Sequence, residues 1–251
     1  MLGLGEAGSA IAADLVAAGL DVRGHDPGPG RDVPGLRRTA EAAAAVAGVR
    51  LVLSLNTGSA AADAAMSALP ALGPTTVYAD LNTSSPELKR RLAAIVGGAG
   101  APFADVALLG PVPGRGLRTP AVASGTGARA VADLLQPLGM PVEVISEEPG
   151  DASTLKLLRS VFMKGVAAAA IESVEGAEAA GQVEWVKREI AGVIGEALLE
   201  RLLEGSRTHA ARRTEEMEAA CELLQQLGVE PRIADAAGSV LAALAASPPG
   251  A

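Results

Sequence analysis

Gly3-Leu4-Gly5-Glu6-Ala7-Gly8 is the stretch of the chain that decides the predicted fold. It has the pattern Gly-x-Gly-x-x-Gly, and an amphipathic, alanine-rich segment follows it as far as Gly19. In a strand–turn–helix unit, the first two glycines let the backbone turn and approach a pyrophosphate, and the third lets the helix pack close to the strand. The N-terminus of the helix then faces the anion. We therefore expect this stretch to bind a dinucleotide.

An acidic residue at the end of the next apolar run supports this prediction. The run Leu20–His25 is followed by Asp26, 18 residues beyond the last glycine of the pattern. An acid at this spacing binds the ribose hydroxyls of a dinucleotide, and its charge repels the 2′-phosphate of NADP. The expected cofactor is NAD or NADP, with NAD favoured by Asp26, although Arg23 and Arg31 nearby keep that preference moderate. The alternative, that Asp26 only forms the turn before Pro27-Gly28, stays open.

Apolar runs alternate with alanine-rich helical stretches as far as about residue 148. Most of the runs are continuous rather than alternating, which is typical of strands that are covered on both faces. Between them, Ser85-Pro86-Glu87 has the cap residue, the first-turn proline and the first-turn acid that a helix start prefers. The predicted fold class is therefore α/β, with a Rossmann-type, doubly wound and mostly parallel sheet. The predicted strands are Leu20–His25, Val49–Asn56, Thr75–Asn82, Ala104–Leu109, Pro120–Ser124 and Pro141–Ser146.

The chain changes character after Pro149-Gly150, where the strands stop and helical patterns take over. We expect a NAD(P)-binding Rossmann domain over residues 1–149 and an all-helical substrate and dimerisation domain over residues 150–251. The helices are rich in alanine, whose small side chain permits close packing, and we therefore expect a homodimer. The predicted helices, separated at Gly181, Gly205 and Gly228–Pro231, cover residues 151–180, 182–203, 207–227 and 232–246, and residues 247–251 form a frayed end.

The start of the chain does not fit a complete Rossmann domain. Only Met1 and Leu2 precede the glycine pattern, although such a pattern should follow a strand. The first strand of a doubly wound sheet lies at its centre, where each buried aliphatic side chain contributes about 1.5–3 kcal/mol. We therefore expect a truncated first strand, with a natural chain that starts upstream or a chain that is truncated or mis-started here.

Composition narrows the classes of function. The chain is 49% hydrophobic and 20% charged, which excludes a disordered protein. Its net charge of −8 and its few aromatic residues argue against a nucleic-acid partner. One cysteine and two histidines far apart do not make a metal site. There is no apolar run of the roughly 20 residues that a membrane span needs, nor a signal peptide, and we expect a soluble, cytoplasmic protein without a membrane partner.

Four segments occur in the order seen in the 6-phosphogluconate dehydrogenase / 3-hydroxyisobutyrate dehydrogenase superfamily, which the chain resembles over nearly its whole length. The later segment THAARRTEEMEAACELLQQLGVEP (208–231) resembles the uncharacterised C-terminal domain that one branch carries. The resemblance implies oxidation of a small hydroxy acid, with hydride passing to nicotinamide. The four segments are GLGEAGSAIAADLVAAG (3–19), SLNTGSAA (54–61), ADLNTSSP (79–86) and GDASTLKLLRSVFMKG (150–165).

The resemblance assigns the catalytic role to a lysine early in the first long helix, in the pattern Gly-x-x-x-x-x-Lys. Gly150 and Lys156 match this pattern. Such a lysine takes the hydroxyl proton as hydride leaves, which requires a pKa lowered toward neutrality. The alternative is a solvated lysine between Leu155 and Leu157.

Two pairs of polar residues end successive predicted strands: Asn56 with Thr57, and Asn82 with Thr83. They are expected along the carboxyl edge of the sheet, where ligands of open α/β sheets bind. In the resemblance they flank the nicotinamide and its ribose, whereas alternatively they only form turns. The superfamily's usual Ser-Gly-Gly substrate loop is absent, and Leu109-Gly110-Pro111 holds its place.

Candidate substrate-binding residues come from the helical half. Ser160 stands where related dehydrogenases usually have an asparagine that touches substrate. Lys164 is a candidate for binding a substrate carboxylate, or alternatively pairs with Glu172 at the surface. His209 and Arg213 lie four residues apart on one helical face, and they either complete an anion-binding substrate pocket, as across a dimer interface, or belong to a solvated, salt-bridged face.

These observations leave three functions to compare. The leading prediction is an NAD(P)-dependent oxidoreductase with Lys156 as general acid/base. The second is a reductase of another C=O or C=N bond on the same scaffold. Lys156 argues against it, because the imine reductases that resemble this fold typically replace the lysine. The third is a non-catalytic dinucleotide-binding protein, favoured by the short first strand and the missing Ser-Gly-Gly. The sequence identifies neither the substrate nor the direction of the reaction.

Overall fold

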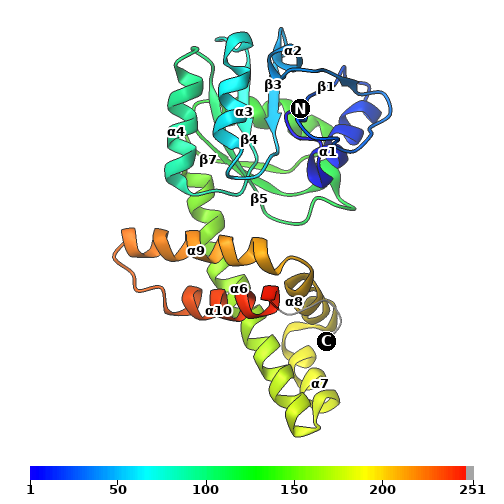
Figure 1. Ribbon diagram of the computed structural model, residues 1–251, viewed down its shortest axis with the longest axis vertical. Coiled ribbons are helices and arrows are strands. Elements are labelled where there is room, and N and C mark those ends of the chain that lie inside the picture. The colour runs from blue at the N-terminus through cyan, green and yellow to red at the C-terminus, as the bar shows by residue number, and fades with distance from the viewer. Residues whose placement is uncertain (247–251) are drawn as a thin grey trace. The chain divides into compact units, whose positions relative to one another are not determined.

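The computed structural model describes residues 1–246, so the predicted end at residues 247–251 lies outside the described residues. The chain divides into two compact units, Met1–Lys156 and Leu157–Ala251, and each is described by itself. The division falls within the long helix α6 (Asp151–Ala180), which begins just after the predicted boundary at residue 149. Figure 1 shows strands only in the first unit.

The first unit is built on a five-stranded sheet in the order β3-β4-β5-β6-β7. Neighbouring strands are parallel except at β5 and β6, which run antiparallel. The connection between them, residues 109–120, contains a 3-10 turn and not the crossover helix that usually joins parallel strands. A second pair, β1 and β2, is also parallel. The strands are β1 (Arg23–Gly24), β2 (Arg37–Arg38), β3 (Leu51–Ser54), β4 (Val77–Asp80), β5 (Phe103–Leu108), β6 (Ala121–Ser124) and β7 (Val142–Ser146).

The mostly parallel α/β fold predicted from the sequence is confirmed, and every predicted apolar run overlaps a strand. The strand β2 was not predicted, because two exposed arginines do not form an apolar run. Helices cover both faces of the sheet (Figure 1). They are α1 (Glu6–Ala17), α2 (Ala42–Val46), α3 (Ala61–Ala68), α4 (Pro86–Gly97) and α5 (Ala128–Leu135), with 3-10 turns at Leu69–Ala71, Gly116–Arg118 and Gln136–Leu138.

The segment before the glycine pattern forms isolated bridges that join the two sheets. Leu2 donates its N–H to the carbonyl of Leu53 at 2.8 Å and accepts from the N–H of Leu55 at 2.7 Å. On its other side Gly3 donates to the carbonyl of His25 at 2.9 Å. Leu2 is 1% exposed and bridges β1 to β3 in parallel register. The glycine pattern therefore follows a paired, buried segment, as a Rossmann turn requires.

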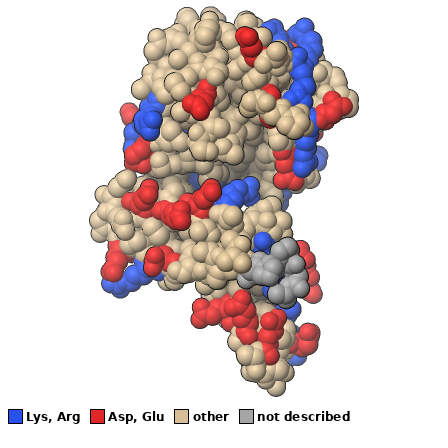
Figure 2. Space-filling view, in the orientation of Figure 1, with Lys and Arg blue, Asp and Glu red and all other residues tan. Residues whose placement is uncertain are grey.

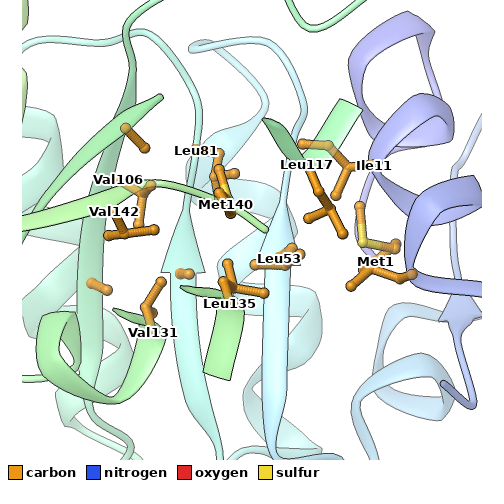
Figure 3. Close-up of a cluster of buried hydrophobic side chains, with 14 of the residues drawn as sticks. Met1, Ile11, Leu53, Leu81, Val106, Leu117, Val131, Leu135, Met140 and Val142 are labelled. Atoms are coloured by element: carbon orange, nitrogen blue, oxygen red, sulfur yellow. The ribbon is translucent and has the colours of Figure 1, made fainter. Parts of the chain in front are cut away.

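Aliphatic side chains fill most of the core of the first unit on both faces of the sheet, and one face also holds the stacked pair Tyr78 and Phe103. Figure 3 shows one of these clusters, in which Met1 and Ile11 lie beside Leu117, and Leu135 and Met140 pack against the strands. The start of α4 was predicted correctly. The Ser85 hydroxyl accepts from the N–H of Leu88 at 3.3 Å, and Pro86 is the first helical residue.

The second unit consists of helices packed on two buried clusters. The prediction of one helix over residues 182–203 is wrong, because Gly195 has φ +85° and separates two helices there. Gly205, predicted as a break, lies inside a helix, and a Cβ on it would lie 2.7 Å from the Arg213 guanidinium. None of the described helices is long and apolar enough to span a membrane. The helices are α6 (Asp151–Ala180), α7 (Val183–Ile194), α8 (Glu196–Thr208), α9 (Ala210–Gln226) and α10 (Arg232–Ala246).

Candidate functional site

Two glycines of the pattern, Gly3 and Gly5, precede α1, and the third, Gly8, lies in its first turn. The fold requires some of these glycines but not all of them. Gly3 has φ +94°, and a Cβ on it would lie 2.1 Å from the carbonyl oxygen of Leu55. A Cβ on Gly8 would lie 2.2 Å from the carbonyl oxygen of Gly3. The fold itself therefore requires glycine at these two positions.

Gly5 is different, because the described atoms of the fold give no reason for a glycine there. Its backbone, at φ −68° and ψ −162°, is extended and open to any residue. Apart from Gly5 itself and its neighbours in the chain, no described residue has an atom within 4 Å of where its Cβ would be. Gly5 is the N-cap of α1, whose first N–H groups have no partner within the helix. The open space at a helix N-terminus fits the close approach of a pyrophosphate.

Asp26 binds the glycine loop and the turn that follows β1. Its Oδ2 accepts from the N–H of Leu4 at 2.6 Å, and its Oδ1 accepts from the N–H of Gly28 at 2.8 Å. The carboxylate therefore forms the turn and also lies beside the predicted dinucleotide loop, so the two predicted roles are compatible. Glu6 lies in the same loop and pairs with Arg31 at 3.7 Å, where both side chains are exposed.

Several arginines lie at this end of the first unit, together with acidic residues. Figure 2 shows Lys and Arg along its edge near α1 and β1. The arginines of the two short strands are Arg23, Arg37 and Arg38, and Arg38 donates to the carbonyl of Gly28 at 3.2 Å. Arginines therefore lie near the acid that would repel a 2′-phosphate, although Arg37 pairs with Asp21 and Arg31 with Glu6.

The polar residues that follow β3 and β4 are brought together by hydrogen bonds. The side-chain oxygen of Asn82 accepts from the N–H of Asn56, whose own amide donates to the Ser54 hydroxyl at 2.8 Å. The carboxyl ends of these strands thus form one edge, as predicted. Thr57 is exposed and accepts from the N–H of Ala60 at 3.3 Å, which is the turn-forming role.

Lys156 reaches this same edge from the first turns of α6. Its Nζ donates to the Thr83 hydroxyl at 2.7 Å. Gly150, just before α6, has φ +100°, and a Cβ on it would lie 2.9 Å from the carbonyl oxygen of Pro86. The glycine thus allows α6 to start directly against the start of α4. The side chain of Lys156 is half-buried and meets the residue after Asn82, which the spacing alone could not have shown.

Two of the candidate substrate residues meet inside the second unit. Lys164 Nζ lies 2.9 Å from Glu216 Oε2 and 3.3 Å from the Ser160 hydroxyl, which itself donates to Glu216. The Lys164 side chain is 15% exposed, and burial lowers its pKa against the opposing effect of Glu216. Lys164 therefore pairs with Glu216 and not with Glu172, the surface partner considered from the sequence.

The other two candidates lie at α8 and the start of α9. Arg213 lies over Gly205 and donates to the Ser206 hydroxyl at 2.7 Å, and its charge contributes to the lowered pKa of Lys164. His209 is the N-cap residue of α9 and lines a shallow hollow together with Glu204 of α8. The sequence missed Glu216, although its position three residues after Arg213 on one helix places the two on the same face.

The sequence also missed a buried ionic cluster in the first unit. Lys89 of α4 lies 3.1 Å from Asp105 Oδ1 and also pairs with Asp80 Oδ1, and all three side chains are 0% exposed. Asp80 and Asp105 face each other in register across β4 and β5. The available signal was one acid inside each of two otherwise apolar strands.

A Rossmann-type sheet with an open glycine turn at the N-terminus of α1 defines a dinucleotide-binding protein. Residues 1–142 match the NAD binding domain of 6-phosphogluconate dehydrogenase, and residues 177–244 match a domain of unknown function, DUF1932. The first match covers more than half of the chain. The chain therefore belongs to the 6-phosphogluconate dehydrogenase NAD-binding family, whose cofactor is a nicotinamide dinucleotide, and the resemblance stated from the sequence is confirmed.

One curated relative matches part of the chain. A protein named "Uncharacterized 28.5 kDa protein in 7S RNA 5′region", from Methanothermus fervidus, is 30% identical over 150 residues, which are 59% of this chain and 56% of that protein. The match thus spans little more than half the length of this curated relative.

Two solved structures cover almost the whole chain. A conserved hypothetical protein from Sinorhizobium meliloti 1021 is 30% identical, with a TM-score of 0.77 over 99% of this chain and 89% of that one. The 3-hydroxyisobutyrate dehydrogenase of Mycobacterium tuberculosis, solved with L-serine, is 22% identical, with a TM-score of 0.83 over 98% of this chain and 92% of that one. The latter likeness shows the fold.

Proposed function

We propose that this protein is an NAD(P)-dependent oxidoreductase that acts on the CH–OH group of a small hydroxy acid, with Lys156 as general acid/base. The observation that carries the proposal is the 2.7 Å hydrogen bond from Lys156 Nζ to Thr83. It holds an amine at the carboxyl edge of the sheet, where ligands of open α/β sheets bind. The family of the chain supports the same class of reaction.

The residues of the glycine loop fit the dinucleotide, since Gly5 leaves open the space in which a pyrophosphate would lie. In this proposal the N–H groups of Gly5, Glu6, Ala7 and Gly8 bind the phosphates, and Gly3 and Leu4 shape the turn. Asn56, Thr57, Asn82 and Thr83 lie beside the nicotinamide and its ribose. When bound, the dinucleotide accepts or donates hydride.

Lys156 supplies the proton transfer that hydride chemistry on an alcohol needs. In oxidation its neutral amine takes the proton of the substrate hydroxyl, and in reduction its ammonium returns that proton to the carbonyl oxygen. The hydrogen bond to Thr83 restricts the amine to one side of the strand end. Such positioned proton transfer contributes about 10²–10⁴-fold to a rate.

The candidate substrate residues remain a separate part of the proposal. Ser160, Lys164, Arg213 and His209 belong to the second unit, where two cations and one acid, Glu216, lie close together. This excess of positive charge is suited to an anionic group such as a carboxylate. A homodimer and a cytoplasmic location stay predictions from the sequence.

The proposal is tested by incubating the protein with NAD⁺ or NADP⁺ and a panel of small 2- and 3-hydroxy acids, and following the absorbance of the reduced cofactor. Reduction with at least one hydroxy acid is expected. Reduction of imines by NAD(P)H, with no oxidation of any hydroxy acid, would favour the second predicted function. Cofactor binding with no turnover on either panel would favour a non-catalytic protein.

Replacing Asp26 by asparagine is expected to shift the cofactor preference toward NADP. The substitution removes the charge that repels a 2′-phosphate, and we expect the ratio of the NADPH and NADH dissociation constants to fall about tenfold, or about 1.4 kcal/mol. Because Asp26 also accepts from Leu4, both affinities will decrease, so the ratio is the informative quantity. Asp21→Asn removes the same charge from the exposed pair with Arg37 and should leave the ratio unchanged. An unchanged ratio in Asp26→Asn would assign Asp26 to the turn alone.

A further inference from the structure

Three charged side chains of the first unit are completely buried beneath the proposed active site. Asp80 ends β4, Asp105 lies on β5 in register with it, and Lys89 comes from α4, and each side chain is 0% exposed. Burial alone would lower the pKa of Lys89, but the charges of Asp80 and Asp105 outweigh it and raise that pKa above its ordinary value. Lys89 therefore stays charged between the two carboxylates.

The cluster is connected at one end to the residues proposed to lie beside nicotinamide. Asp80 Oδ2 accepts from the side-chain amide of Asn82 at 2.7 Å. The oxygen of the same amide accepts from the N–H of Asn56. Asp80 therefore determines which way the Asn82 amide points, and through it the position of the backbone after β3.

At its other end the cluster holds the first turn of α6. Asp105 Oδ2 accepts from the N–H of Ser153 at 2.9 Å, and Asp105 Oδ1 accepts from the Ser153 hydroxyl at 2.9 Å. Ser153 lies one helical turn before Lys156. The N-terminus of α6 also favours a negative charge beside it. One continuous set of hydrogen bonds thus joins Asn56 to the helix that carries Lys156.

Burial of such a cluster contributes little net free energy to the stability of a fold, because the desolvation penalty opposes the attraction between the charges. Moving charges out of water costs several kcal/mol for each ion, and replacing a buried ion pair by apolar residues is often neutral or stabilising. The best-attested benefit of a buried polar group is to fix one arrangement of the elements around it. In this fold, the elements around it are those that present Asn82, Thr83 and Lys156.

We propose that Asp80, Lys89 and Asp105 form a positioning cluster, which sets the strand ends carrying Asn56 and Asn82 relative to the first turn of α6. This inference rests on the proposed function, because it assigns the cluster to the nicotinamide end of the cofactor site. The pyrophosphate and the adenosine ribose are assigned to Gly5 and Asp26, and the Asp26 carboxylate accepts from Leu4 and Gly28 instead of from the cluster.

The test compares NADH with ADP-ribose, which lacks the nicotinamide end. In Ser153→Ala and in Asp80→Asn we expect the affinity for NADH to fall about tenfold and the affinity for ADP-ribose to stay within twofold. Small displacements of positioning groups are sufficient for effects of this size. Thr76→Val is the matched control, since Thr76 is a buried hydroxyl of the same unit that donates only to the carbonyl of Val49, at 2.8 Å.

Ser153→Thr retains a hydroxyl at the same place and should restore NADH affinity relative to Ser153→Ala. It also keeps the test valid if Asp80→Asn does not fold. Equal loss of NADH and ADP-ribose affinity in Ser153→Ala, or no loss of either, would overturn the positioning role. If the unmodified protein binds neither ligand, the proposed function fails and this inference fails with it, an outcome that is visible before any variant is compared.

Discussion

Lys156→Met is expected to lower turnover of the best hydroxy acid by about 10³-fold while the dissociation constant of NADH changes by less than about twofold. Methionine has a similar length and no ionisable group, so the substitution removes the proton acceptor and leaves the packing of α6 largely intact. The expected size lies within the range measured for positioned general acids and bases. Initial rates from cofactor absorbance and a fluorescence titration with NADH measure the two quantities separately.

Lys187→Met is the matched control, because Lys187 belongs to α7 in the second unit and has no part in the proposed mechanism. It should leave both quantities unchanged. A second variant, Thr83→Val, removes the acceptor of the Lys156 hydrogen bond. It should lower turnover by a smaller factor than Lys156→Met does. Retention of full turnover in Lys156→Met would contradict the assignment of Lys156 as the acid/base.

Gly5→Leu is expected to raise the dissociation constants of NADH and NADPH by at least about a hundredfold with little change in folding stability. The backbone of Gly5 suits any residue, and among the described residues no atom lies near the position of its Cβ. A leucine would therefore place its Cβ, without a clash, in the open space proposed for the pyrophosphate. The stability change should stay within about 1 kcal/mol, which is the usual size of an N-cap substitution.

Gly3→Ala serves as the contrast, because it should lower the folding stability, which Gly5→Leu should leave nearly unchanged. Its Cβ would lie 2.1 Å from the carbonyl oxygen of Leu55, at φ +94°, so the backbone must shift. Strain of this kind costs about 1–3 kcal/mol, and the contact adds to it. Denaturant unfolding should show this loss in Gly3→Ala and not in Gly5→Leu. NADH affinity of Gly5→Leu equal to that of the unmodified protein would contradict the proposed site.

The alternation of apolar runs with helices was sufficient to predict the sheet, because strands covered on both faces need continuous apolar sequence. Helix ends in the second unit were harder to predict. Gly195 and Gly205 look alike in sequence, but only Gly195 takes a positive φ. Gly205 instead gives room to the Arg213 guanidinium, a packing relation between α8 and α9 that local sequence does not contain.

The candidate site was predictable where local chemistry determines it and not where tertiary pairing does. Asp26 follows its strand at the spacing expected of a Rossmann fold, and its carboxylate contacts the glycine loop. From the sequence alone, Lys89 is expected to be an exposed residue of an amphipathic helix. Its burial becomes evident only when the fold brings the carboxylates of Asp80 and Asp105 to it. Glu216 was missed for the same reason, since it meets Lys164 across two helices.

Titration of the protein with NADH is the measurement that tests the central claim most directly, namely that the glycine loop before α1 forms a nicotinamide dinucleotide site. We predict saturable binding, followed by NADH fluorescence, and a stabilisation of about 2.7 kcal/mol against thermal unfolding at a ligand concentration one hundred times the dissociation constant. At the same ligand concentration, a hundredfold higher dissociation constant in Gly5→Leu should reduce this stabilisation to about 0.4 kcal/mol or less. Absence of binding and of stabilisation with NADH and with NADPH would contradict the account.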